Sequence, residues 1–83
     1  MKLTEHTKIR KEKFGAVVFE TLTEKVFVAD AVGAEILELI TQRKTLPEIL
    51  ARLTDNYEAD RQVIERDVAE FIEQLRSSKI MCS

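Results

Sequence analysis

The stretch Lys25–Ala29 constrains the fold of this chain more than any other. It is rich in β-branched and aromatic residues and lies between polar segments, which is the pattern of a β-strand. Val26 and Val28 belong to one face of that strand. Phe27 and Ala29 belong to the opposite face, so the strand is apolar on both sides. A strand of this kind needs a layer on each face or a neighbouring strand on each side.

The rest of the chain offers this strand few partners. Phe14–Phe19 is a strong candidate for a neighbouring strand and Lys8–Lys11 a weaker one, while the chain after Ala29 has helical periodicity. We therefore predict an antiparallel meander with Phe14–Phe19 in the centre and Lys25–Ala29 at an edge. An apolar edge with unpaired N–H and C=O groups is an aggregation hazard unless something covers it. Either a bound peptide pairs with this edge, or a helix or the chain's own N-terminus covers it.

Three helices are expected after the strand. Asp30 is a good N-cap for the first helix. Thr45-Leu46-Pro47-Glu48 has the form of a capping box with proline in the first turn of the second. The third is expected from about Asp60 to Arg76. Apolar residues recur with helical spacing at the following positions: Val32, Ile36, Leu39 and Ile40; Leu46, Ile49, Leu50 and Leu53; Ile64, Val68, Phe71, Ile72 and Leu75.

These elements predict an α+β fold, in which a small three-stranded antiparallel sheet is followed by three helices. Such a sheet lays one face on the helices. If the third helix runs beside the edge strand, a groove forms between Lys25–Ala29 and the helix border from Val63 to Gln74.

The bulk properties indicate one domain over residues 1–83, with a loose N-terminal arm over residues 1–7. At 83 residues the chain is too short for two cores, and its net charge of −2 provides no general attraction for nucleic acid or anionic lipid. No signal peptide is recognisable, and no apolar run reaches the roughly 18–20 residues of a membrane span. The single cysteine fits a reducing compartment. We predict a cytoplasmic protein.

No group of residues indicates catalysis. His6 is the only histidine and Cys82 the only cysteine. Zinc needs three or four converging ligands, and a cysteine nucleophile needs a base to activate it. The two glycines are isolated and do not form a phosphate-binding loop. The sequence therefore predicts no enzyme activity, no catalytic residues, no metal site and no cofactor.

DNA binding is the rival function. The helices Thr45–Leu53 and Asp60–Arg76 have the spacing of a helix-turn-helix unit, so a winged-helix nucleic-acid-binding protein is the alternative hypothesis. A recognition helix presents basic and amide side chains to the DNA. The predicted third helix instead carries more acidic than basic residues, and an acidic helix is a poor match for phosphate.

An ordered set of short segments resembles the PqqD-like family. The similarity extends over roughly residues 10–81. At Asp30, at Thr41-Gln42 and at Lys79 the chain departs from residues common in the family, which affects cap and turn geometry. The resembling segments are Phe14–Val18, Val26–Asp30, Gly33–Leu37, Thr45–Ile49 with Leu53 and Tyr57, and Asp67-Val68 with Phe71-Ile72 and Leu75.

The resemblance implies a winged-helix-like peptide-recognition domain, the RiPP recognition element. Such a domain binds the leader of a ribosomally synthesised precursor peptide and delivers it to a modifying enzyme, either a radical-SAM maturase or a lasso-type protease. In this family the leader adds as a strand beside the third strand, against the third helix, by β-augmentation. The same free edge is also available for homodimer formation when no peptide is bound.

The resemblance also implies which residues contact the peptide. Phe27, Val63 and Phe71 are expected to form side-chain pockets, although core packing is the alternative role for Phe71. Arg66 and Gln74 are expected, with Asp67, to set the register of the peptide. The complete predicted peptide-binding set is Lys25, Val26, Phe27, Val28, Ala29, Val63, Arg66, Asp67, Phe71 and Gln74.

Overall fold

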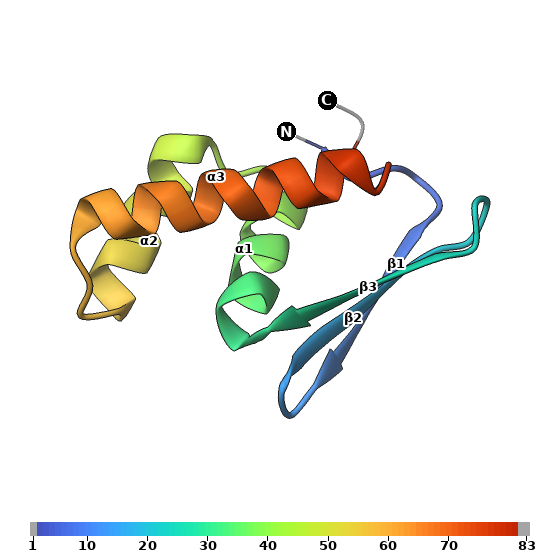
Figure 1. Ribbon diagram of the computed structural model, residues 1–83, viewed down its shortest axis with the longest axis horizontal. Coiled ribbons are helices and arrows are strands. Elements are labelled where there is room, and N and C mark those ends of the chain that lie inside the picture. Colours follow the sequence, from blue (N-terminus) through green and yellow to red (C-terminus); the bar gives the residue numbers. More distant parts are fainter. Residues whose placement is uncertain (1, 82–83) are drawn as a thin grey trace.

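The computed structural model describes residues 2–81 and consists of a three-stranded sheet followed by three helices (Figure 1). The strands pair antiparallel in the order β1-β2-β3, which confirms the predicted α+β fold and the meander with β3 at an edge. The elements are β1 (Thr7–Glu12), β2 (Gly15–Glu20), β3 (Lys25–Asp30), α1 (Ala31–Thr41), α2 (Leu46–Asn56) and α3 (Arg61–Ser77).

One face of the sheet packs against the helices. Strand alternation places Ala16 and Val18 of β2 on this face, and both are buried. The register places Ile9 of β1 and Phe27 of β3 on either side of Val18. The helices complete the core with one apolar stripe each: Ile36, Leu37, Leu39 and Ile40 from α1, Ile49 and Leu53 from α2, and Ile64, Val68, Ile72 and Leu75 from α3.

Each helix begins at a residue whose side chain accepts a backbone hydrogen bond. Asp30 Oδ1 accepts from the N–H of Gly33 at 2.8 Å and caps α1. Thr45 and Glu48 form the predicted capping box of α2, with N···O distances of 2.9 and 3.3 Å. Asp60 caps α3. These local signals explain why the helix starts were predictable.

The N-terminal residues differ from the loose arm that was expected over residues 1–7. Leu3 forms an isolated antiparallel bridge with Met81, and the N–H of Thr4 donates to the carbonyl oxygen of Ile80 at 2.8 Å. Leu3 also packs against the core. Leu3 and Thr4 therefore pair with the C-terminal segment rather than with β3, and within residues 2–81 no part of the arm pairs with the free edge of the sheet.

Gly15 holds the start of β2 close to the end of β3. Its φ of +153° lies in a region that L-residues with a side chain rarely adopt. A Cβ at this position would lie 2.1 Å from the carbonyl oxygen of Ala29. Only glycine permits this approach, which brings β3 to the first turn of α1.

The helices of residues 2–81 include none with the length and apolar character needed to cross a membrane.

Candidate functional site

The third strand has one paired edge and one free edge. Within residues 2–81, β2 is the strand that pairs with β3, and no second strand lies on its other side. Val26 and Val28 are 59% and 64% exposed, so the free edge is also apolar. This arrangement matches the edge predicted for Lys25–Ala29.

The hydrogen-bond pattern of the sheet shows which backbone groups face that edge. The N–H of Thr21 donates to the carbonyl oxygen of His6 at 3.0 Å, one step beyond the paired residues of β1 and β2. Hydrogen-bonded and non-hydrogen-bonded pairs alternate along an antiparallel ladder. Applied to the β2–β3 register, this alternation directs the backbone polar groups of Phe27 toward β2. Those of Val26 and Val28 face away from the sheet and are available to a partner strand.

A cavity of about 250 Å³ lies where β3 meets α1, against one side of α3. We call it the α3 groove. Three of the predicted residues, Asp67, Phe71 and Gln74, line it. The complete lining is Asp30, Val32, Gly33, Ile36, Asp67, Glu70, Phe71 and Gln74.

Phe71 connects the groove to the sheet. Its ring meets the ring of Phe27 edge to face, with centroids 5.6 Å apart and planes at 75°. A Cβ on Gly33 would lie 2.7 Å from Cε1 of Phe71, so a larger residue in α1 would displace the ring from this position. Phe71 is partly buried against the core and also lines the groove. Core packing is therefore observed for Phe71, and its contact with a bound peptide stays a prediction.

The charged residues that line the α3 groove are all acidic. Asp30 approaches from the end of β3, while Asp67 and Glu70 belong to α3. No lysine or arginine is among the lining residues. The groove therefore combines an apolar floor with a negative potential, a combination that favours a peptide with apolar and cationic side chains.

A second cavity, of about 170 Å³, adjoins the first through their shared residues Val32 and Asp67. It is mainly apolar. The sequence analysis did not predict it, because Leu53 and Tyr57 have the spacing of core residues and nothing local shows that they border a cavity. The lining is Val32, Leu53, Tyr57, Ala59, Ile64, Asp67 and Val68.

Tyr57 is fixed at this cavity by a polar contact. Its hydroxyl donates to Glu35 Oε2 at 2.9 Å, and Asn56 Nδ2 donates to Glu35 Oε1 at 2.5 Å. The hydrogen bond to Glu35, followed by burial, raises the pKa of Tyr57 above its usual value of 10.0. The phenol therefore stays neutral at physiological pH and holds the end of α2 against α1.

Two of the predicted site residues on α3 line neither cavity. Val63 is 38% exposed, one turn before Asp67, and lines neither. Arg66 is exposed as well. It directly precedes Asp67 and is therefore rotated by about 100° around the helix axis, since an α-helix has about 3.6 residues per turn. Their predicted contacts with a peptide stay predictions.

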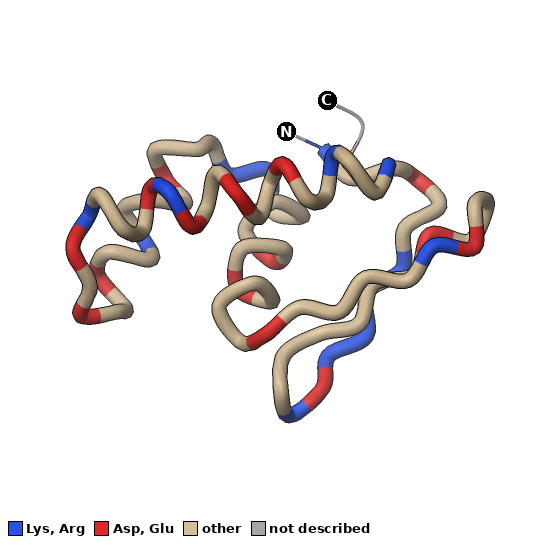
Figure 2. Tube along the Cα trace, in the orientation of Figure 1, with Lys and Arg blue, Asp and Glu red and all other residues tan. Residues whose placement is uncertain are grey.

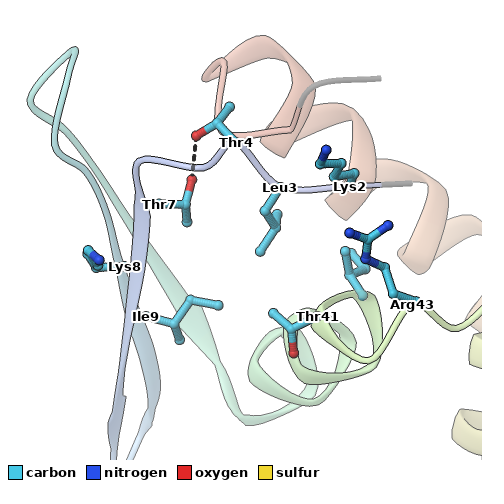
Figure 3. A pocket seen from close by; sticks show the side chains of 9 residues that line it. Lys2, Leu3, Thr4, Thr7, Lys8, Ile9, Thr41 and Arg43 are labelled. Carbon is cyan, nitrogen blue, oxygen red and sulfur yellow. Dashed lines mark hydrogen bonds between the residues drawn. The ribbon is translucent and has the colours of Figure 1, made fainter.

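The other edge of the sheet borders a different cavity, of about 410 Å³. Leu3, Ile9 and Thr41 point into it, and Lys2 and Arg43 lie near its opening (Figure 3). The hydroxyl groups of Thr4 and Thr7 are 2.7 Å apart beside it. This cavity contains none of the predicted site residues.

Charge is distributed unevenly over the surface. Lysine and arginine are concentrated on β1 and the turn that follows it, whereas acidic residues recur along α3 (Figure 2). Residues 2–81 contain no group of three or more His, Cys, Asp or Glu side chains placed to hold a metal ion. His6 is exposed, and Cys82 lies outside the described residues.

Comparison with known proteins gives one family and two closely similar structures. The family model described as "Coenzyme PQQ synthesis protein D (PqqD)" matches residues 15–80. No curated protein sequence matches the chain significantly.

Both similar structures contain a bound peptide. One is TbiB1 in complex with the TbiA(beta) leader peptide; it is 26% identical, has a TM-score of 0.93 and matches 100% of this chain and 96% of that one. Another is a lasso peptide synthetase B1 complexed with the leader peptide. It is 18% identical, with a TM-score of 0.89 over 99% of this chain and 96% of that one, and supports the fold.

Proposed function

This chain belongs to the PqqD family, and from that premise we propose that it binds the leader of a ribosomally synthesised precursor peptide and delivers it to a modifying enzyme. The observation that carries the proposal is the free, apolar edge of β3 beside the α3 groove. The similar TbiB1 structure, which is a complex with a leader peptide, supports it.

Strand addition explains how one small domain holds a flexible peptide. The outward N–H and C=O groups of Val26 and Val28 pair with the peptide backbone, which supplies affinity independently of the peptide's side chains. Alternate side chains of the added strand then point toward α3, because neighbouring residues in a strand point to opposite faces. Specificity follows from what the α3 groove accepts.

The groove favours a particular peptide chemistry. Phe71 and Phe27 provide an aromatic floor, so a large apolar side chain fits there. Asp67 and Glu70 provide negative charge at the border, so a lysine or arginine nearby in the leader is favourable. Gln74 offers a donor and an acceptor for the peptide backbone. The second cavity extends this surface toward Tyr57 for a further apolar residue.

The chain is proposed to act by binding alone, in the cytosol. The modification itself belongs to the partner enzyme, a radical-SAM maturase or a lasso-type protease. The DNA-binding alternative is not favoured, because neither the family match nor the two similar structures point to nucleic acid. An empty β3 edge is also open to a second copy of the chain, and bound leader is expected to compete with such a dimer.

Isothermal titration calorimetry with separate halves of the cognate precursor tests this function. The leader half is expected to bind with one-to-one stoichiometry, and the core half is expected to bind at least about a hundredfold more weakly, or about 2.7 kcal/mol. Equal affinity for both halves, or no affinity for the leader, would refute the proposal.

A further inference from the structure

The sheet has a second surface that the α3 groove does not use. Strand alternation places Val17 and Phe19 of β2 on the face opposite the helices, together with Val26 and Val28 of β3. The register pairs Val17 with Val28 and Phe19 with Val26, so these four side chains form one continuous block. We call this block the outer face.

The part of the chain that the structure describes does not fully bury this block: Val26 and Val28 are exposed, and Val17 and Phe19 are half-buried. The helices pack on the opposite face of the sheet (Figure 1), and none of its four side chains belongs to the hydrophobic core or packs against it. Val26 and Val28 are 59% and 64% exposed. Exposed apolar side chains that cluster, instead of occurring singly, mark interaction surfaces.

The border of the outer face is basic. Lys8 and Arg10 of β1 lie opposite Phe19 and Val17 in the register. The guanidinium carbon of Arg10 lies 5.7 Å from the centroid of the Phe19 ring. Its Nε donates to Glu12 Oε1 at 2.6 Å, which holds the side chain along the strand. Because Glu12 already pairs with Arg10, the border carries a net charge of about one positive unit, which favours a partner with an acidic side chain where it meets β1.

The area of the outer face argues against a second copy of this chain as the occupant. Three strands of six residues, spaced about 4.8 Å apart with a rise of about 3.3 Å per residue, present roughly 290 Å². A stable interface buries about 800 Å² on each partner. The occupant must therefore extend beyond the sheet of one domain.

A bound leader would enlarge this surface. A peptide strand on β3 widens the sheet, and every second peptide side chain then lies beside Val26 and Val28 on the outer face. From these observations we propose that the outer face, completed by the bound leader, is the docking surface for the modifying enzyme, which contacts it through apolar side chains bordered by acidic ones. This inference rests on the proposed function and extends it. The sheet would hold the leader at the β3 edge and bind the modifying enzyme on its outer face.

The test uses the purified enzyme that modifies the cognate precursor, immobilised for biolayer interferometry. The full chain is applied after saturation with leader. The variants are the double substitution V17T/F19T, which removes apolar area while keeping β-propensity, and R10E, which reverses the charge of the border. The matched control is L46T, because Leu46 is an exposed apolar residue on α2, away from the sheet.

Both V17T/F19T and R10E are expected to weaken enzyme binding at least about tenfold, with leader affinity by calorimetry within twofold of the unaltered chain. L46T is expected to change neither. Circular dichroism confirms that each variant is folded, and R10E, a surface substitution on β1, provides the answer if V17T/F19T does not fold.

Unchanged enzyme affinity in folded R10E would overturn the inference. The proposed function is decided separately, by the calorimetric affinity of the unaltered chain for the leader. An equal loss in L46T would also overturn it, because the effect would then not be specific to the outer face. Sedimentation of the chain alone measures its oligomeric state. A dimer that forms in the unaltered chain and is lost in R10E would show that a second copy binds this face, and it would overturn the inference.

Discussion

The two edges of the sheet differ in chemistry, and the difference shows how a small protein leaves one strand open safely. The β1 edge reads Lys-Ile-Arg-Lys-Glu over residues 8–12, whereas the β3 edge reads Val-Phe-Val-Ala over residues 26–29. Charged side chains discourage another strand from adding to an edge, and apolar ones favour it. This difference favours the β3 edge for the proposed strand addition.

The surroundings of the two edges reinforce this difference. The β3 edge lies beside the α3 groove, whose charged lining residues are acidic, while the cavity beside β1 has Lys2 and Arg43 near its opening. A peptide that pairs with β3 can also place side chains against Phe71 of α3. Backbone pairing and side-chain selection thus occur on the same side of the domain.

The largest expected effect comes from removing one outward N–H from the β3 edge. Val28→Pro deletes a donor that faces the free edge of β3, and proline is tolerated in edge strands. Leader affinity is expected to fall by roughly fivefold to 150-fold, since an unmade backbone hydrogen bond costs roughly 1–3 kcal/mol. Calorimetry measures the affinity, and circular dichroism confirms the fold.

Lys11→Pro is the matched control on the opposite edge. By the same alternation the N–H of Lys11 faces away from β2, so this variant also keeps the sheet ladder. Its leader affinity is expected to equal that of the unaltered chain. A similar loss in both variants would show that the leader does not distinguish the two edges.

A smaller effect is expected from the charge of the α3 groove. The double variant D67N/E70Q removes two carboxylates from its lining and should weaken a lysine- or arginine-containing leader by about threefold to tenfold at low salt. The loss should diminish as salt rises, because screening already weakens these contacts. Fluorescence anisotropy over a salt series measures both trends.

The control for charge is E65Q/E73Q on the same helix. Glu65 and Glu73 line neither the α3 groove nor the second cavity. This variant changes the net charge of α3 by the same amount. An equal loss of affinity would attribute the effect to the overall field rather than to the groove.

The smallest expected effect concerns the hairpin that positions β3. Glu20 accepts hydrogen bonds from the N–H groups of Leu22 and Thr23 and from the Thr23 hydroxyl, at 2.8–3.1 Å. These bonds lower the pKa of Glu20 below its usual value of 4.5, and the bond from the N–H of Leu22 has the largest effect. The ionised carboxylate therefore stabilises the folded state above about pH 4.5, and this stabilisation is lost as pH falls through the lowered folded pKa.

Glu20→Gln is expected to lower the urea midpoint at pH 7 and to reduce its decline on acidification. It should also speed amide hydrogen exchange of residues 21–25. Glu48→Gln, which removes a carboxylate of lowered pKa in the α2 capping box, is the control and should affect exchange only near α2. Faster exchange in the hairpin for both variants would contradict a local role for Glu20.

Features encoded by neighbouring residues were predictable from the sequence. The β-branched and aromatic composition of Lys25–Ala29 predicted a strand. Asp30 and Thr45 predicted helix starts, because capping chemistry acts over three or four residues. The strand order was predicted because Phe14–Phe19 was the one strong candidate to pair with Lys25–Ala29, which placed Phe14–Phe19 in the centre of the sheet. Each of these predictions depends on local physics that a sequence displays directly.

Features that depend on distant contacts were not predictable in the same way. The pairing of Leu3 with Met81 joins opposite ends of the chain, so the N-terminal arm looked loose. Gly33 gave no sign that it makes room for Phe71. Arg66 was expected to help set the register of the peptide; it is not among the residues that line the α3 groove, and that role stays a prediction.

The central claim is that leader binds as a strand on the β3 edge, and an NMR titration of isotope-labelled chain with cognate leader tests it most directly. The largest amide shifts are expected at residues 24–30, above all at Val26 and Val28, followed by residues 63–74 of α3. Residues 7–12 of β1 should change little. Tight binding with shifts confined to residues 8–13 or 46–53, and none in β3, would contradict strand addition.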